Sequence, residues 1–335
     1  MKKMLALGTL LSLIAVSCTD DDSMSSQSNP ELKLVTSSNT TGKISFVDLL
    51  STNSSIFSFS VNGTDNDGIY YNSFSDEVIL ASRTNNRLET YSGLKNGVET
   101  NTDNLMLSNF SSNMDFTNAR EIAISGDKII VTQDQATINN DTNKFLVYQK
   151  TTSGYNLINE YTLDFKIWGI HAEGTTLYAV ADLTSDILVF ENFFSLASGT
   201  IMPTKRVTIE GLTRTHGITY SANDDVMILT DVASAADATD GGLIVINNFT
   251  TVLNSTSNMG TIAMSNQKRI YGASSTLGNP VDVAYDYVTN VIYVAERANG
   301  GGKVLTFNIP TASGDVAPVD SRAEAGVAAV YLLRK

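Results

Sequence analysis

The feature that most constrains the fold is an internal repeat. A short apolar run of strand-forming residues recurs six times, at intervals of roughly 45 to 65 residues. Its copies begin at Ile69, Ile122, Ile170, Ile218, Val283 and Val327. A period of this length is typical of four-stranded propeller blades and is too long for a leucine-rich or helical solenoid. The chain is therefore expected to be an all-β protein.

Each copy continues with further short apolar runs separated by polar turns. A second run ends at Arg83, Asp134, Asp182, Asp231 and Glu296 in the five complete copies. A third run follows ("RLETY", "FLVYQ", "ILVFEN", "LIVINN", "VLTFNI"), and a weaker fourth one includes "KRVTIEG" and "KRIYGAS". This order predicts four antiparallel strands in each repeat, the composition of a propeller blade.

The two ends of the chain complement each other. The sixth copy, residues 327–333, closes the sequence with a first strand only, whereas "ELKLVTSS", "GKISFVDL" and "SIFSFSVNG" near the start match strands two, three and four. Pairing them would close the ring and remove its exposed edges. We therefore predict a six-bladed β-propeller whose closing blade is shared by the N- and C-terminal strands. Seven blades are the alternative if the longest interval, between Ile218 and Val283, hides a further copy.

The segment at residues 279–309, "NPVDVAYDYVTNVIYVAERANGGGKVLTFNI", shows one repeat in full. It resembles the blades of NHL-type, YncE-like and lactonase-like propellers. The resemblance extends over residues 31–335 as architecture, and it implies a disc with a central channel.

The N-terminus has the pattern of a secretory signal. Lys2 and Lys3 precede an apolar run that ends at Val16 and is too short to cross a bilayer. Cys18 is the only cysteine, so no internal disulfide can form. Residues 14–18, "IAVSC", resemble the lipobox of bacterial lipoproteins, which implies acylation of Cys18 after cleavage. The alternative is a plain secretory signal followed by an unmodified cysteine.

A polar segment, "TDDDSMSSQSNP", follows this cysteine and has nothing to bury, which is typical of a solvated tether. Its Asp20, Asp21 and Asp22 resemble the export signal of Bacteroidota-type surface lipoproteins. The predicted organisation is a signal peptide at 1–17, an acylated cysteine and tether at 18–30, and a propeller at 31–335. The resemblance implies a lipid-anchored outer-membrane protein at the cell surface, with the periplasmic face as the alternative.

The net charge limits the possible partners. The chain carries 22 Lys and Arg against 35 Asp and Glu, a formal net charge of −13. Nucleic acid is not an expected partner, because nothing supplies the cationic surface that it needs. Contact with the membrane is expected through the lipid anchor alone. An envelope protein or an extracellular polymer is the expected partner.

In the predicted topology the chain enters strand one, and turns from strand two to strand three, on the same face of the disc. Polar and aromatic residues at these points are therefore expected to line the mouth of the channel and bind a ligand. They are Arg120, Glu121, Trp168, His216 and Asp282 at the strand-one starts, with Asp182, Asp231 and Glu296 at the strand-two ends. The alternative for Asp182 and Asp231 is to bond to turn amides. His171, inside strand one, is expected to pack between blades.

No nucleophile elbow, phosphate loop, HExxH or CxxC motif occurs in the chain. This favours a non-catalytic binding scaffold, for which no cofactor is expected. The alternative is a metal-dependent hydrolase similar to six-bladed lactonases, with Glu121 and Asp282 as candidate ligands for Ca²⁺. The matching positions carry Gly169, Gly217 and Gly326, where that family uses Asn. Whether the protein is an enzyme is left open by the sequence.

Overall fold

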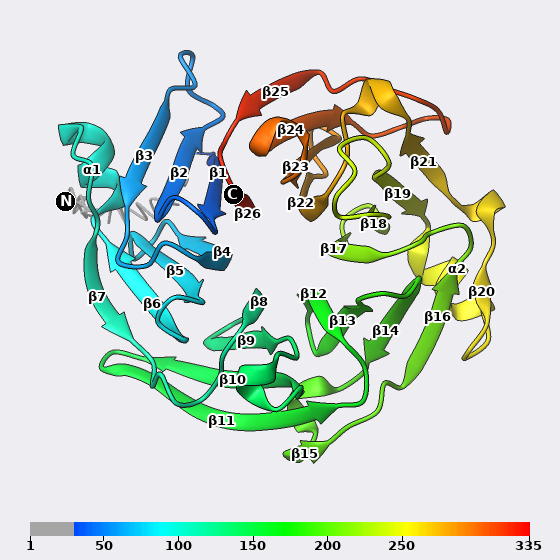
Figure 1. Ribbon diagram of the computed structural model, residues 1–335, viewed down its shortest axis with the longest axis horizontal. Coiled ribbons are helices and arrows are strands. Elements are labelled where there is room, and N and C mark those ends of the chain that lie inside the picture. Colours follow the sequence, from blue (N-terminus) through cyan, green and yellow to red (C-terminus); the bar gives the residue numbers. More distant parts are fainter. Residues whose placement is uncertain (1–29) are drawn as a thin grey trace, which may run out of the picture.

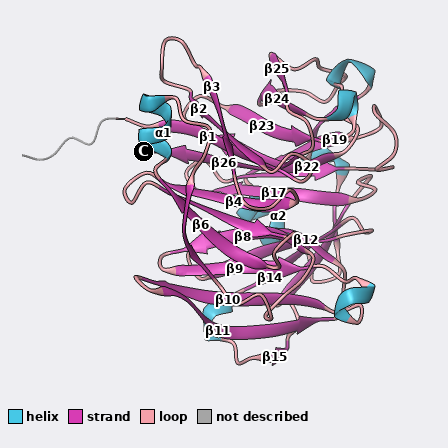
Figure 2. Ribbon diagram, turned by 60° about the vertical axis from the view of Figure 1, so that its left-hand side comes forward, coloured by secondary structure: helices cyan, strands magenta, loops and turns pink. Residues whose placement is uncertain are grey.

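The computed structural model describes residues 30–335, whose strands form six small sheets arranged in a ring (Figure 1). Strands dominate, and the helices are short (Figure 2). The predicted six-bladed β-propeller is confirmed. We number the blades in chain order from the first complete one and name their strands from the axis outward.

The bounds of the blade strands are as follows. Blade 1 holds β4 (Asn66–Asn72), β5 (Glu77–Ser82), β6 (Arg87–Ser92) and β7 (Met106–Phe110). Blade 2 holds β8 (Ala119–Ser125), β9 (Lys128–Gln133), β10 (Asn143–Thr151) and β11 (Gly154–Leu163). Blade 3 holds β12 (Ile167–Glu173), β13 (Thr176–Ala181), β14 (Asp186–Phe190) and β16 (Lys205–Ile209). Blade 4 holds β17 (Thr215–Ser221), β18 (Val226–Asp231), β19 (Gly242–Asn247) and β21 (Lys268–Tyr271). Blade 5 holds β22 (Pro280–Asp286), β23 (Val291–Glu296), β24 (Lys303–Asn308) and β25 (Asp320–Ala323). Blade 6 holds β26 (Val327–Arg334), β1 (Leu32–Ser38), β2 (Lys43–Asp48) and β3 (Ile56–Ser60).

The remaining elements lie in the connections between these strands. They are α1 (Leu94–Thr100), α2 (Phe249–Ser255), the two-residue strands β15 (Gly199–Thr200) and β20 (Thr261–Ile262), and five 3₁₀ turns at Thr137–Asn139, Phe193–Ser195, Met264–Asn266, Ala273–Ser275 and Asn299–Gly301. The longest repeat interval contains α2 and β20, so its extra length is a connection and not a seventh blade. None of the helices in residues 30–335 has the length and hydropathy needed to span a bilayer.

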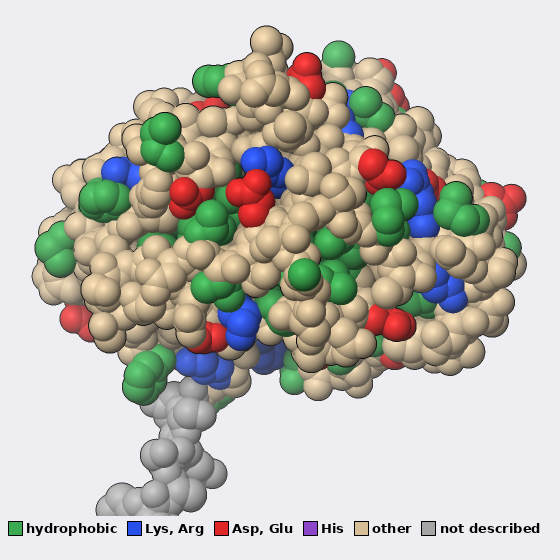
Figure 3. Space-filling view, turned by 90° about the horizontal axis from the view of Figure 1, so that it is seen from below, with side chains coloured by type: hydrophobic (Ala, Val, Ile, Leu, Met, Phe, Trp, Pro, Cys, Tyr) green, Lys and Arg blue, Asp and Glu red, His purple; other side chains and the backbone are tan. Residues whose placement is uncertain are grey.

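The connections also join neighbouring blades. β15 leaves blade 3 and pairs in parallel with β11 of blade 2, and β20 leaves blade 4 to pair with β16 of blade 3. Single parallel bridges repeat the arrangement between Asn104 and Ser60 and between Gly314 and Ile270. Each bridge covers part of an outer strand edge that would otherwise be open to pairing with another chain. On the side of the disc in Figure 3, acidic and basic side chains are scattered among isolated apolar ones.

Ring closure occurs as predicted, because β26 pairs antiparallel with β1 along its length. The register corrects one detail of the sequence alignment. Ser38 pairs with Val327 as Ser82 pairs with Asn66, so Val327 corresponds to Asn66 and not to Ile69. β26 is apolar and has no polar residue that identifies its position in the repeat. Its sequence alignment with the other first strands was therefore wrong by three residues. Ala329, and not Gly326, therefore stands at the level of Gly169 and Gly217.

The core consists of apolar side chains packed between adjacent sheets. Between blades 3 and 4, for example, Val180 and Ile187 pack with Met227 and Leu229, all of them buried. Near the axis the innermost strands come so close that a Cβ at Gly169 would overlap the carbonyl oxygen of His216. The glycines at this level are thus explained by the close approach of neighbouring strands.

Candidate functional site

The innermost strands begin on one face of the disc, here called the upper face. Four side chains at the same level there contact one another from blade to blade. Asp67 Oδ2 is 3.8 Å from Arg120 Nη1, the Arg120 guanidinium is 4.0 Å from the centre of the Trp168 ring, and the Trp168 and His216 rings stack with centroids 3.6 Å apart. Trp168 and His216 are 7% and 1% exposed, respectively. The predicted residues Arg120, Trp168 and His216 therefore do come together, as a packed arc.

Asp182 is the centre of charge in this region. Its buried carboxylate accepts hydrogen bonds from Arg214 at 2.6 and 3.1 Å and lies 3.0 Å from both His216 Nε2 and Lys166 Nζ. Burial alone would raise the pKa of Asp182, but the hydrogen bonds from His216 and Arg214 hold it well below its usual value. Burial lowers the pKa of His216 to about 4, so the imidazole is neutral at pH 7.

Asp134 connects this centre to the arc. It accepts hydrogen bonds from Arg120 at 3.0 and 3.1 Å and lies 3.9 Å from Lys166. The charges at the upper face are thus compensated within the protein, and the predicted carboxylate Asp182 is fully engaged with cationic partners.

Asp231 and Glu296 hold turns. Asp231 accepts the backbone N–H groups of Thr213, Arg214 and Ala233 and the hydroxyl of Tyr271. Glu296 accepts the N–H groups of Gly278, Asn279, Ala298 and Asn299. The contacts of Asp231 match the turn-bonding alternative given for it, and Glu296 has the same role.

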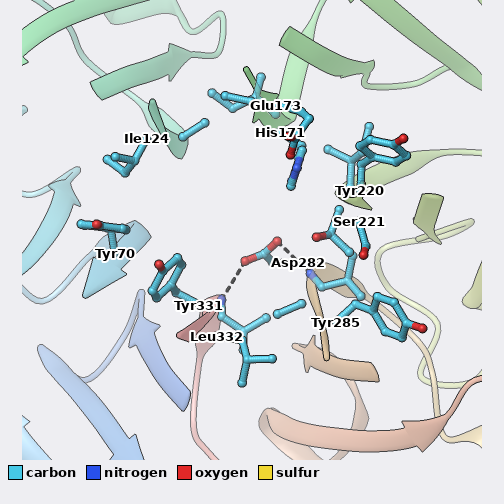
Figure 4. A pocket seen from close by; sticks show the side chains of 18 of the residues that line it. Tyr70, Ile124, His171, Glu173, Tyr220, Ser221, Asp282, Tyr285, Tyr331 and Leu332 are labelled. Carbon is cyan, nitrogen blue, oxygen red and sulfur yellow. Dashed lines mark hydrogen bonds between the residues drawn. The ribbon is translucent and has the colours of Figure 1, made fainter. Parts of the chain in front are cut away.

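Glu121 and Asp282 belong to a different environment, one level further along the innermost strands. Both line a central pocket of about 640 Å³, at the end nearest the upper face, which is here called its floor. Figure 4 shows Asp282 and its two hydrogen bonds there. Asp282 accepts the N–H groups of Val283 and Val330, both at 2.7 Å, and Glu121 accepts that of Ile122 at 2.8 Å. Neither carboxyl forms an ion pair within residues 30–335.

The missing counter-charge affects the acidity of both groups. Burial raises the pKa of Asp282 to about 7. Burial, together with the negative charge of Asp282, raises the pKa of Glu121 well above its ordinary value. Two carboxyls whose protonated forms are favoured by burial therefore face the same cavity.

The pocket opens on the face opposite the upper one, because its lining includes Ser221, Asn223 and Tyr287 at the ends of innermost strands. Its wall carries tyrosines from several blades. Tyr70 and Tyr331 meet edge to face with ring centroids 4.9 Å apart. The hydroxyls of Tyr220 and Tyr285 bond to acidic residues in the turns, whereas those of Tyr70 and Tyr331 make no hydrogen bond to the described residues.

Sequence analysis missed this wall. His171 packs between blades as expected, edge to face with Tyr220 of the next blade at 6.3 Å between ring centroids, and it also lines the pocket. Burial lowers its pKa to about 4. Tyr70, His171 and Tyr331 share one level of the innermost strands. A correct alignment of β26 would have shown that this level is rich in aromatic residues and adjacent to Glu121 and Asp282.

The residues present fit a resident metal ion poorly. No group of three or more His, Cys, Asp or Glu side chains in residues 30–335 is arranged to hold one. Glu121 and Asp282 already accept amide hydrogen bonds, and Gly169, Gly217 and Ala329 offer no side-chain oxygen at their level. Ca²⁺ takes about six to eight oxygen ligands. Two partly engaged carboxyls fall well short of that set.

No protein-family model matches the chain, and its sequence matches no curated protein. Its fold is similar to that of solved structures. A chain in a nidogen/laminin complex aligns with a TM-score of 0.60 and 12% identity, over 90% of this protein and 98% of that chain. A putative 6-phosphogluconolactonase from Bacteroides fragilis aligns with a TM-score of 0.58 and 11% identity, over 92% and 99%.

The chain is a six-bladed β-propeller. At these identities the two likenesses support the fold alone, since one fold carries many unrelated functions. Function must be argued from the pocket and from its side chains.

Proposed function

We propose that this propeller is a lipid-anchored binding protein of the outer membrane, displayed at the cell surface, which holds its ligand in the central pocket. The observation that carries the proposal is the pocket itself. It is large enough for a small ligand or for the end of a polymer, its wall is aromatic, and a few polar groups converge at its floor. That combination is typical of ligand sites.

The anchor is proposed from the sequence, because Cys18 and Asp20 to Asp22 lie outside the described residues. Labelling cells with a palmitate analogue tests it. The wild-type protein should carry the label, whereas Cys18→Ala should lose it and be released in soluble form. Replacing all three aspartates with Ala should keep the label but protect the protein from protease added to intact cells. A Cys18→Ala protein that stays in the membrane fraction would contradict the anchor.

Binding is tested with the secreted Cys18→Ala protein. A panel of neutral oligosaccharides, organic amines and phosphorylated sugars is screened for an increase in melting temperature. At least one class should stabilise the protein, because a ligand that binds only the folded state raises its stability. Ala123→Trp, which fills the pocket from β8, should abolish the increase. Stabilisation that persists in this variant would place binding outside the pocket.

The second candidate is the metal-dependent, lactonase-like hydrolase. Its support is the convergence of Glu121 and Asp282 on one cavity, together with the fold shared with a putative lactonase. The acidic floor opposes it for phosphorylated substrates, because an anion would approach two carboxyls. Hydrolysis of a phosphorylated sugar lactone in the presence of Ca²⁺, lost in Glu121→Gln, would favour this candidate over the binding protein.

A further inference from the structure

The central pocket has an excess of acidic groups. Glu121, Glu173 and Asp282 line it, and its basic side chain Arg334 forms an ion pair with Asp286. His171 adds no positive charge, because burial keeps its pKa at about 4. The acidic groups that line the cavity therefore outnumber the basic ones, and they give its interior a net negative charge when they ionise.

Unlike Asp182, the two carboxyls at the floor of the pocket have no basic side chain beside them in the part of the chain that the structure describes. The Asp182 carboxylate is buried at the upper face and is surrounded by Lys166, Arg214 and His216. Glu121 and Asp282 come from β8 and β22, in blades separated along the ring, and within residues 30–335 their hydrogen-bond donors are backbone N–H groups alone. Each carboxylate oxygen can accept more than one hydrogen bond. The carboxylate oxygens of Glu121 and Asp282 could therefore accept further hydrogen bonds from a cation that carries N–H groups.

The walls suit the apolar part of such a cation. Tyr70 and Tyr331 present aromatic surface beside the floor, and Figure 4 shows Tyr331 and His171 flanking Asp282. Aromatic faces attract ammonium groups and also pack against hydrocarbon. A hydrated divalent metal ion would gain little from these rings.

Resting on the proposed function, we propose that the pocket binds an organic ammonium ion, whose N–H groups donate to Glu121 and Asp282 and whose apolar body lies against Tyr70 and Tyr331.

Binding of this kind is linked to protons. In the empty pocket the raised pKa values of the two carboxyls favour their protonated forms, and an incoming ammonium ion displaces a proton when it pairs with them. The affinity for an amine therefore rises as the pH increases through about 7, where Asp282 ionises. Other titratable groups that line the pocket are Tyr70, His171, Glu173, Tyr220, Tyr285, Tyr331 and Arg334, and Asp67 lies one level above the floor. His171 stays neutral and the tyrosines stay protonated in this range. Burial raises the pKa of Asp67 to about 6, so its ionisation adds negative charge in the lower part of the range and strengthens the same rise in amine affinity.

Three probes of one shape test the charge requirement by calorimetry on the Cys18→Ala protein: cyclohexylamine, cyclohexanol and cyclohexanecarboxylate. The amine should bind about tenfold or more tightly than the alcohol, because a cation gains Coulomb energy from two nearby carboxylates. The carboxylate should not bind. Glu121→Gln should weaken amine binding by about tenfold and leave alcohol binding unchanged. Glu191→Gln, which removes an exposed acidic charge at the end of β14, is the matched control and should bind the amine as wild type does.

Proton release gives an independent readout. Amine binding measured in two buffers of different ionisation enthalpy should show proton release, and the affinity should be greater at pH 8 than at pH 6. Equal binding of amine and alcohol, or no effect of Glu121→Gln, would overturn the ammonium proposal while leaving a ligand pocket in place. Absence of binding by all three probes would overturn it as well. The proposed binding function has its own test. It fails if no class of compound in the screening panel raises the melting temperature of the protein in a way that Ala123→Trp abolishes.

Discussion

Trp168 and His216 lie face to face, with ring centroids 3.6 Å apart and planes inclined by 5°. They come from β12 and β17, so the stack joins the innermost strands of two neighbouring blades. On the side of blade 2, the guanidinium of Arg120 covers the indole at 4.0 Å. The only tryptophan of the chain thus reports on the contact between three blades.

The fluorescence of Trp168 should therefore respond to the protonation of His216. Burial places the pKa of His216 at about 4, so emission should change with a midpoint near pH 4. The change arises because an imidazolium in face contact withdraws electron density from the excited indole. Emission and far-ultraviolet circular dichroism are recorded together, to separate this step from unfolding. His216→Gln should remove the step, and a midpoint near the ordinary value of 6.5 would show that the ring is solvated.

Asp182 should be the most costly carboxylate to neutralise. Asp182→Asn leaves Lys166 and Arg214 without their shared partner in a buried setting, and we expect a loss of about 3–5 kcal/mol in the free energy of unfolding. Urea denaturation measures it. The control is Asp186→Asn, whose pair with Arg206 is partly exposed and should cost about 1 kcal/mol or less. Equal losses in the two variants would contradict a special role for Asp182.

The contribution of Asp182 to the free energy of unfolding depends on pH, and the direction of its pKa shift gives the sign of that dependence. The folded pKa lies below the ordinary value of 3.8, so the stabilisation is present above about pH 4 and is lost as the pH falls further. His216 acts in the same sense over a higher range. Its pKa falls from 6.5 to about 4 on folding, so stability decreases as the pH drops through that interval.

Glu121 should behave in the opposite way. Its pKa is raised on folding, so the protonated carboxyl is favoured and stability falls as the pH rises above about 4.5. Glu121→Gln mimics the protonated form and can keep the hydrogen bond from Ile122. The variant should melt about 2–4 °C above wild type at pH 8, with little difference at pH 5. A lower melting temperature at pH 8 would show that Glu121 is ionised and held by a partner.

The sequence predicted the fold well because the repeat carries local signals. Strand-two runs recur in each blade, and the register confirms that Arg120, Trp168 and His216 share one level. The polar residues at the strand-two ends do not all share a level, because Asp231 pairs with Thr215 at the level of Ala181, one residue before Asp182. Polar residues that recur at the same point of each repeat allow the repeats to be aligned. Residues at one position of the alignment lie at the same level of neighbouring blades, where they can contact each other. The contact between these three residues could therefore be anticipated from sequence alone.

The pocket could not be anticipated in the same way. Whether an acidic residue faces a cation, a turn amide or a cavity depends on neighbours far away in sequence. Asp282, for example, accepts a hydrogen bond from Val330 in another blade, and Asp182 meets Arg214 across a blade boundary. The misaligned β26 also hid Tyr331. Pairwise geometry, and not residue type, decides which carboxylates remain free to meet a ligand.

The contact between Asp282 and Val330 leads to a prediction about ring closure. Val330 donates its N–H to Asp282 of blade 5 and lies in β26, which pairs with β1. Removing residues 327–335 would unpair one edge of β1 and open the wall of the pocket. The truncated protein should aggregate or melt well below wild type, and a synthetic peptide of residues 326–335 added in excess should restore part of the lost stability, since strand addition supplies the missing backbone hydrogen bonds. Lys335→Ala, which keeps the strand intact, is the control. An unchanged melting temperature after truncation would mean that blade 6 is stable without its innermost strand, contrary to the pairing described above.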